Sequence, residues 1–205
     1  MATATRTYGP EMHGQRMTYD EFVSAPWREG HQYELIHGRI VVAPIPNMPH
    51  DCLDDWITEG LKSYSRRKPK VVNYVSTAPR IFVPGFDDDY TTCPEPDIAA
   101  YSDFPADLPF SERDWRDFSP ILVVEVLSPE NSDKDLVRNV ELYEMVPSIR
   151  EYWIVDGLES ADRPSLIVYR RRGRGWQKPI HVPYRETYTT KLLPGFELVV
   201  DPHAK

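Results

Sequence analysis

A single glutamate inside the most hydrophobic segment of the chain places the strongest constraint on its fold. Residues 121–127 read Ile-Leu-Val-Val-Glu-Val-Leu, seven residues with one charge. A near-continuous run of branched apolar residues is typical of a central strand that is buried on both faces. A buried carboxylate costs several kcal/mol unless it is paired, protonated or bound to a cation. The segment therefore predicts a central strand in which Glu125 either pairs with an arginine or has a function.

The patterns around this strand predict the fold class. Apolar residues recur with helical spacing over residues 50–68, and a second helix is expected from Asn131 or Ser132 to about Met145. The next strand is expected over residues 150–156, and a strand–helix–strand order implies a right-handed crossover between parallel strands. Further strands are expected over residues 33–36 and 39–43, which form a hairpin, and over 71–76, 80–83, 97–101, 165–171, 176–182 and 196–201. The pattern indicates an α/β or α+β fold with a mixed central sheet.

Length and composition limit the class of protein. A chain of 205 residues fits one domain, which we expect over residues 17–201 after a flexible leader over 1–16. No apolar run approaches the roughly 20 residues that span a bilayer, and the N-terminus lacks the apolar segment of a secretion signal. Cys52 and Cys93 form no CxxC motif, so a reducing, cytoplasmic location is expected. The net charge of −8 disfavours binding nucleic acid by bulk charge alone.

Three carboxylates in predicted strands are candidate site residues. Glu125 lies near the C-terminal end of its strand, where sites gather in open α/β sheets. Asp97 follows Pro96 at the start of a predicted strand, although a Pro-Asp pair is also a turn signal. Glu34 interrupts the apolar run 33–36, where the alternative is a solvent-facing hairpin position. Carboxylate oxygens suit Mg²⁺ or Mn²⁺, which can activate water and neutralise charge that develops on a phosphate.

Other chemistries have less support. The chain has no GxGxxG or Walker A motif, so no nucleotide cofactor is expected. It has no GxSxG motif, so a serine hydrolase is unsupported, and no HExxH motif of a histidine metal site. A glycosidase that uses Glu34 and Glu125 as acid and base would need their carboxyl groups roughly 5–9.5 Å apart. Two basic clusters, over residues 66–70 and 170–174, could contact a phosphate backbone or could be solvated ends of elements.

The order of motifs along the chain is similar to that of a known family. It resembles the Uma family of restriction endonucleases, within the PD-(D/E)XK nuclease superfamily, over about residues 17–200. The blocks Glu-Val-Leu-Ser-Pro and Glu-Tyr-Trp-Ile-Val-Asp are specific in combination. The residues that carry the resemblance are Tyr33 to Gly38, His50, Pro96 and Asp97, Pro120 to Pro129, Asp135, Tyr143, Glu151 to Asp156 and Leu193 to Phe196.

The resemblance implies a restriction-endonuclease-like fold, with helices around a mixed sheet, additional β-hairpins and a metal site at one edge. It implies that Asp97, Glu125 and the backbone carbonyl of Val126 bind Mg²⁺ or Mn²⁺. Glu34 would match the acidic residue ahead of the PD motif, and His50 a histidine that the family often carries. It further implies DNA as the substrate and, as in many nucleases of this superfamily, a homodimer.

One departure from the family pattern concerns the catalytic lysine. The superfamily position after the second acidic residue holds Leu127, and the helix position that usually carries the lysine in this family holds Asn139. Asparagine can orient water but cannot balance a phosphate charge. Arg138 points about 100° away on a helix, and Lys134 would reach the site only if its loop folds back. Two hypotheses follow: a metal-dependent DNA endonuclease, or a catalytically degenerate binding or assembly module with the same fold.

Overall fold

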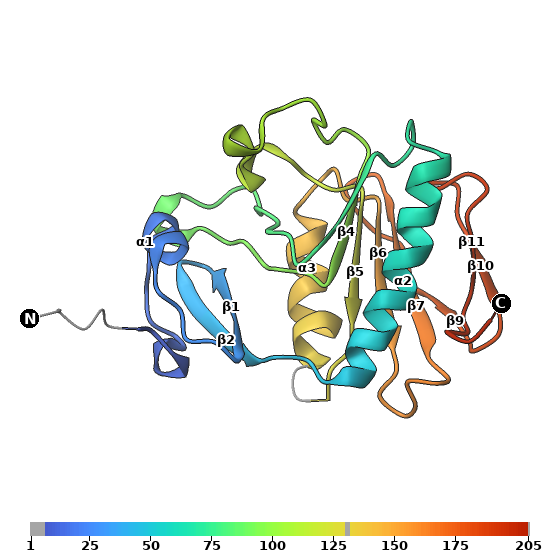
Figure 1. The fold of residues 1–205 in the computed structure, drawn as a ribbon, viewed down its shortest axis with the longest axis horizontal. Coiled ribbons are helices and arrows are strands. Elements are labelled where there is room, and N and C mark those ends of the chain that lie inside the picture. Colours follow the sequence, from blue (N-terminus) through green and yellow to red (C-terminus); the bar gives the residue numbers. More distant parts are fainter. Residues whose placement is uncertain (1–6, 130–131, 205) are drawn as a thin grey trace, which may run out of the picture.

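A seven-stranded sheet forms the centre of the protein in a computed structural model that describes residues 7–129 and 132–204 (Figure 1). The strand order is β3-β4-β5-β6-β7-β8, and β9 also pairs with β7. The pair β5–β6 is parallel, and the other pairs of this sheet are antiparallel. The mixed α+β fold expected from the sequence is thus confirmed. The strands are β3 (Tyr74–Thr77), β4 (Ile98–Tyr101), β5 (Leu122–Val126), β6 (Glu151–Asp156), β7 (Ser165–Arg172), β8 (Gly175–Trp176) and β9 (Ile180–Val182).

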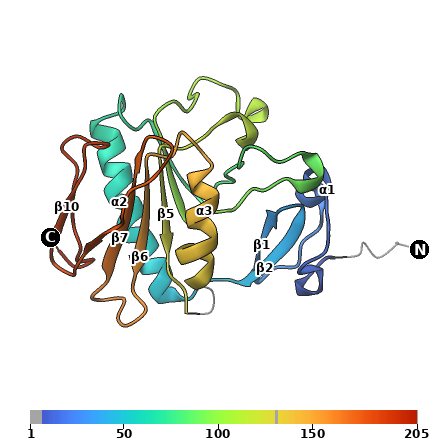
Figure 2. The same cartoon turned by 180° about the vertical axis from the view of Figure 1, so that it is seen from behind.

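Two helical segments cover opposite faces of the sheet (Figures 1 and 2). The long helix α2 (Met48–Arg67) packs its apolar stripe on one face. On the other face lies a helix that begins with a π-helical turn, η5 (Lys134–Arg138), and continues as α3 (Asn139–Glu144). This helix connects β5 to the parallel strand β6, as the crossover prediction required.

Strand β5 divides its side chains between the two faces. Val124 and Val126 pack in the cluster beneath α2, whereas Val123 and Leu127 pack in the cluster beneath α3. Because side chains alternate along a strand, Glu125 points to the α3 face. It is fully buried there.

A separate hairpin contributes the N-terminal part of the molecule. Strands β1 (His31–Ile36) and β2 (Arg39–Pro44) pair through a turn at His37 and Gly38, which have φ values of 51° and 66°. Such a turn requires positive φ at both positions. A Cβ atom at Gly38 would collide with the backbone carbonyl of Asp89. The hairpin packs on α1 (Tyr19–Ser24), which begins at a capping box formed by Thr18 and Glu21.

Part of the expected flexible leader is attached to this hairpin. The short 3₁₀ turn η1 (Pro10–Met12) precedes Gly14, whose N–H donates to the carbonyl of Ile40. The N–H of Ile40 in turn donates to the carbonyl of Gln15. Gly14 and Gln15 are therefore hydrogen-bonded to β2. Residues 1–6 and the proposed cap at Asn131 lie outside the described residues.

Two strand predictions were wrong. Residues 80–83 form no strand. The backbone N–H groups of Ile81 and Val83 donate to the carbonyls of Pro94 and Thr92, which belong to an irregular segment. Pro79 and Pro84 flank these residues and have no N–H, so the pairing cannot extend into a regular β ladder. The predicted strand 176–182 divides into β8 and β9, because Pro179 interrupts it in the same way.

The remaining elements are short. Strand β10 (Thr187–Thr189), which the sequence did not predict, pairs with β11 (Glu197–Val199) and covers the α2 side of the core. Three further 3₁₀ turns are η2 (Asp88–Tyr90), η3 (Phe110–Glu112) and η4 (Trp115–Asp117). Among the described helices, none is long and apolar enough to cross a membrane.

Candidate active site

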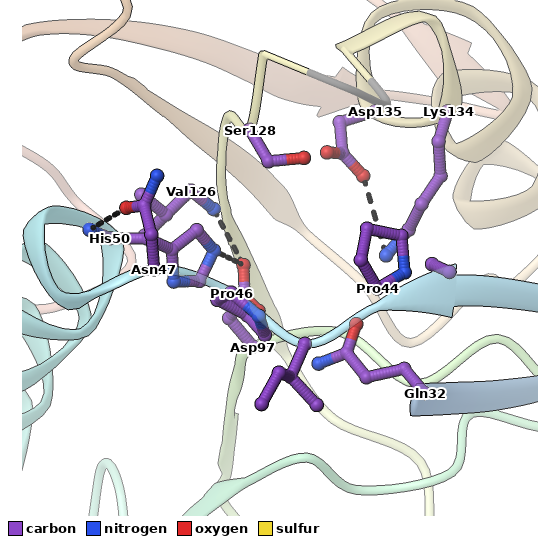
Figure 3. Close-up of a pocket in the computed structure, with 12 residues that line it drawn as sticks. Gln32, Pro44, Pro46, Asn47, His50, Asp97, Val126, Ser128, Lys134 and Asp135 are labelled. Carbon is purple, nitrogen blue, oxygen red and sulfur yellow. Dashed lines mark hydrogen bonds and ion pairs between the residues drawn. The ribbon is translucent and has the colours of Figure 1, made fainter. Parts of the chain in front are cut away.

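Four groups of elements meet around a small cavity at the C-terminal end of β5 (Figure 3). The four groups are the β1–β2 hairpin, the first turn of α2, the strand pair β4–β5 and the π turn η5. The cavity has a volume of about 90 Å³, and its lining includes His50, Asp97, Ser128, Lys134 and Asp135. Since a water molecule takes up about 30 Å³ in the liquid, only a few waters or a small ion fit inside.

Glu125 has one satisfied and one unsatisfied oxygen. Its Oε1 accepts hydrogen bonds from Nδ2 of Asn139 at 2.7 Å and from the hydroxyl of Tyr143 at 2.8 Å. Its Oε2 is buried without a hydrogen bond, and Nζ of Lys134 lies 3.7 Å away. Burial raises the pKa of Glu125 well above its ordinary value, and nearby carboxylates reinforce this against the charge of Lys134.

Asp97 is held at the start of β4 by two neighbours. Its Oδ2 accepts a hydrogen bond of 2.7 Å from the backbone N–H of Val126, the residue after Glu125. Nε2 of His50, in the first turn of α2, lies 3.4 Å from the same oxygen. Burial alone would lower the pKa of His50, but its hydrogen bond and charge interaction with Asp97 raise it above the ordinary value. Asp97 and Glu125 thus lie on adjacent strands around the Val126 backbone.

Glu34 is buried, so the solvent-facing alternative is wrong. Its Oε1 accepts from the backbone N–H of Glu95 at 3.1 Å, and its Oε2 pairs with Nη2 of Arg138 at 2.7 Å. Burial favours the neutral acid, but the charges of Lys134 and Arg138 outweigh it and lower the pKa of Glu34. Glu34 therefore connects the hairpin to the π turn as an ionised carboxylate.

Lys134 reaches the site from the beginning of the helix. Its Nζ lies 3.6 Å from Oε1 of Glu34, 3.7 Å from Oε2 of Glu125 and 3.8 Å from Oδ1 of Asp135. The side chain is only 11% exposed. Burial disfavours a charged lysine, but the surrounding carboxylates dominate and raise its pKa. Lys134 is thus a buried ammonium in contact with three carboxylates.

Arg138 and Asn139 both bond within the site, although a regular helix would turn Arg138 away. Nε of Arg138 donates to Oδ1 of Asn139 at 3.0 Å while its Nη2 holds Glu34. Nδ2 of Asn139 bridges Oε1 of Glu125 and Oδ1 of Asp135, at 2.7 and 3.1 Å. Asn139 therefore fixes the positions of two carboxylates.

Two residues of the site were not among the candidates from the sequence. Asp135 is buried, and burial together with nearby carboxylates raises its pKa to about 7, against the charge of Lys134. Tyr143 was named among the residues that carry the family resemblance, and its hydroxyl holds Glu125. The position of both residues in the family motif was the available signal.

The site holds more carboxylates than permanent cations. If all four carboxylates, Glu34, Asp97, Glu125 and Asp135, were ionised, they would outnumber Lys134 and Arg138 by two, the charge of one divalent ion. The raised pKa values of Glu125 and Asp135 mean that burial instead favours their neutral acids. Within the described residues, no three His, Cys, Asp or Glu side chains come together as a ready metal site. Mg²⁺ nevertheless commonly takes only one or two protein carboxylates and completes its shell with water.

The two basic clusters lie away from this site. The cluster over residues 66–70 spans the C-terminal end of α2, whereas the site lies at the first turn of this helix, and a helix of 20 residues is about 30 Å long. The cluster over 170–174 lies at the C-terminal end of β7. Because β7 is antiparallel to β6, this end lies beside the N-terminal ends of β5 and β6, away from the site at the C-terminal end of β5. There, Arg171 donates to the carbonyls of Tyr143, Glu144 and Val146 at the end of α3, which gives it a structural role.

Comparison with solved structures finds the same α+β fold in another protein. The crystal structure of "a putative nuclease belonging to DUF820 from Anabaena variabilis ATCC 29413" matches with a TM-score of 0.62 and 19% sequence identity, over 90% of this chain and 95% of that chain. The family whose profile matches residues 19–201 is Uma2, described as "Putative restriction endonuclease". The chain belongs to this family, as its motifs indicated. No curated protein matches the sequence.

Proposed function

We propose that the protein is a metal-dependent endonuclease that hydrolyses phosphodiester bonds in DNA at the site around Glu125. The observation that carries the proposal is Oε2 of Glu125, a buried carboxylate oxygen without a hydrogen-bond donor in a cluster of four carboxylates and two permanent cations. Family membership supports a nuclease activity. A cation that meets this oxygen would take the place of the missing donor and favour the ionised form of Glu125.

The residues present fit Mg²⁺ or Mn²⁺. Asp97, Glu125 and the backbone carbonyl of Val126 would hold the ion, since all three offer the oxygen ligands that these hard cations prefer. When bound, a divalent ion there would neutralise charge on the phosphate and favour ionisation of the attacking water.

The surrounding residues orient these ligands. Asn139 and Tyr143 fix Oε1 of Glu125 and leave Oε2 for the cation. The Val126 N–H and His50 fix Asp97. In hydrolysis, the oxygen of water bonds to phosphorus as one phosphorus–ester oxygen bond breaks. The water loses a proton to solvent, and the departing oxygen gains one.

The lining of the cavity suits a backbone phosphate as the reacting group. His50 and Lys134 line it beside Asp97 and Asp135, polar groups that can bind phosphate oxygens, water and a cation. None of its described lining residues is Phe, Tyr or Trp, so the glycosidase alternative gains no aromatic platform for a sugar. One site cuts one strand, and we therefore propose that two copies of the chain form a homodimer to cleave both strands. Light scattering with and without DNA would test this oligomeric state.

The test is cleavage of plasmid DNA with Mg²⁺ or Mn²⁺ by the wild type and the variants Asp97→Ala and Glu125→Ala. Exposed Glu59 on α2 gives a matched control, Glu59→Ala. We expect nicking or linearisation by the wild type and the control but not by the site variants. Absence of cleavage with either metal, or equal cleavage by the site variants, would contradict the proposal.

The second candidate is the catalytically degenerate binding module, because Leu127 and Asn139 occupy the two positions where related nucleases carry the catalytic lysine. It predicts an inactive wild type that still binds DNA. Cleavage that appears only in an Asn139→Lys variant would favour this candidate over the first.

A further inference from the structure

We propose that Lys134 supplies the positive charge that Asn139 lacks and stabilises the phosphate as negative charge develops on it. This inference rests on the proposed nuclease function and assigns one further residue to the same site. Its starting point is the position of the Lys134 ammonium, which the sequence alone did not place at the carboxylates.

The ammonium of Lys134 lies near three carboxylates without a short hydrogen bond to any of them. Its Nζ lies 3.6–3.8 Å from oxygens of Glu34, Glu125 and Asp135. Charge-assisted hydrogen bonds are shorter, about 2.7–2.9 Å. The ammonium is therefore attracted by three carboxylates but forms a close bond with none of them, so its three N–H groups can turn to a phosphate oxygen in the cavity that Lys134 lines.

The π-helical turn explains how a residue five positions before Asn139 reaches the same carboxylate. In an α-helix, five residues rotate about 500°, so Lys134 would point about 140° away from Asn139. The segment Lys134–Arg138 is instead π-helical, and the N–H of Asn139 donates to the carbonyl of Lys134. An i→i+5 turn is wider, so residues five apart lie close to one face. Lys134 and Asn139 accordingly meet Glu125 on its two different oxygens.

Arg138, the other cation of the site, is not available for this role. Its guanidinium is bonded to Oε2 of Glu34 at 2.7 Å and to Oδ1 of Asn139 at 3.0 Å. It also lies outside the lining of the cavity, whereas Lys134 and Asp135 enter the cavity side by side (Figure 3). Arg138 therefore orients Glu34, and Lys134 is the cation that faces substrate.

A competing role for Lys134 is that of a tethered counter-ion that occupies the place of the metal. The two roles predict opposite effects of removing its charge. If the ammonium stabilises the reacting phosphate, neutral substitution slows cleavage and leaves metal binding intact. If it blocks the metal, the same substitution accelerates cleavage.

The experiment compares Lys134→Met, which keeps most of the apolar stem, with Lys62→Met, an exposed lysine of α2. Plasmid cleavage is measured at saturating Mn²⁺, and Mn²⁺ binding without DNA is measured by calorimetry. We expect Lys134→Met to cleave about 10²–10³-fold more slowly, with an Mn²⁺ affinity equal to or tighter than that of the wild type. Lys62→Met should match the wild type in both measurements.

A second-site variant separates lost charge from lost folding. Adding Asn139→Lys to Lys134→Met returns an ammonium to the other side of Glu125, and it should restore cleavage at least tenfold. Cleavage by Lys134→Met at or above the wild-type rate, loss of its Mn²⁺ binding, or no rescue by the second change would each overturn the role of Lys134 while the nuclease function stands. A wild type that cleaves no DNA overturns both.

Discussion

Two buried glutamates on neighbouring parallel strands have opposite surroundings. Glu151 begins β6 and pairs in register with Leu122, so it lies about 10 Å along the sheet from Glu125. Its Oε2 accepts from Nε1 of Trp153 at 2.8 Å and from the hydroxyl of Tyr188 at 3.0 Å, and its Oε1 accepts from Thr190. In Glu125, both donors, Asn139 and Tyr143, bond to Oε1, and Oε2 has no hydrogen-bond donor.

The difference is between a carboxylate whose oxygens are both bonded and one with a free oxygen. Three neutral donors satisfy Glu151, which thereby connects β6 to the β10–β11 hairpin. The environment of Glu125 holds more acidic groups and leaves Oε2 without a donor, the position where the proposed cation would bind. Both glutamates are buried, so burial alone does not distinguish the proposed site.

The largest expected effect is on catalysis by Glu125→Gln. The amide keeps the shape and can still accept from Asn139 and Tyr143, but it loses the charge that attracts a divalent ion. We expect plasmid cleavage to fall by more than about 10³-fold, beyond the loss from one electrostatic contact. The matched variant Glu151→Gln should retain cleavage, and an equal loss in both would erase the distinction between the two glutamates.

Stability should show the reverse preference. Glu151→Ala leaves Trp153, Tyr188 and Thr190 without their acceptor, and we expect the free energy of unfolding to drop by about 2–4 kcal/mol. Urea denaturation measures this loss. A change below 0.5 kcal/mol, the usual range for surface substitutions, would show that these bonds do not hold the hairpin to the sheet.

Metal binding should stabilise the wild type. At a metal concentration of about 100 times Kd, the gain is about 2.7 kcal/mol, visible as a higher Tm. Glu125→Gln should abolish the shift and Glu151→Gln should keep it. A shift that survives Glu125→Gln would place the ion elsewhere.

The smallest effect concerns pH in the presence of a chelator. Because burial raises the pKa of Glu125 in the folded state, the wild type is penalised as pH rises above the unfolded value of about 4.3. The stability of Glu125→Gln relative to wild type should therefore increase with pH in denaturation curves measured between about pH 5 and pH 8. A constant difference would show that Glu125 is not destabilised by its charge.

The parts of the fold that depend on local sequence patterns were predicted correctly. The apolar run with one acid predicted β5 and its buried Glu125, and the strand–helix–strand order predicted the parallel pair with β6. The extended segment 80–83 was mistaken for a strand because its composition suits one. Its neighbours in space, Thr92 and Pro94, belong to an irregular segment instead.

The site itself depends on long-range contacts that periodicity does not encode. Glu34 is buried by Glu95 and Arg138, which lie 61 and 104 residues further along the chain. Lys134 could not be placed because its direction depends on whether one helical turn is α or π. No spacing rule in the sequence distinguishes these two turns.

That turn ties the direction of Lys134 to both the length and the hydrogen bonding of the loop–helix junction. If all five residues of the segment Lys134–Arg138 were kept but the turn tightened to α-helix, Lys134 would point about 140° away from Asn139 and leave the cavity. If the turn tightened and one residue between Lys134 and Asn139 were also removed, the two would stand four residues and about 40° apart, and the ammonium would stay on the same face. A variant that lengthens or shortens this junction therefore moves the ammonium only when the hydrogen bonding of the turn does not change with it.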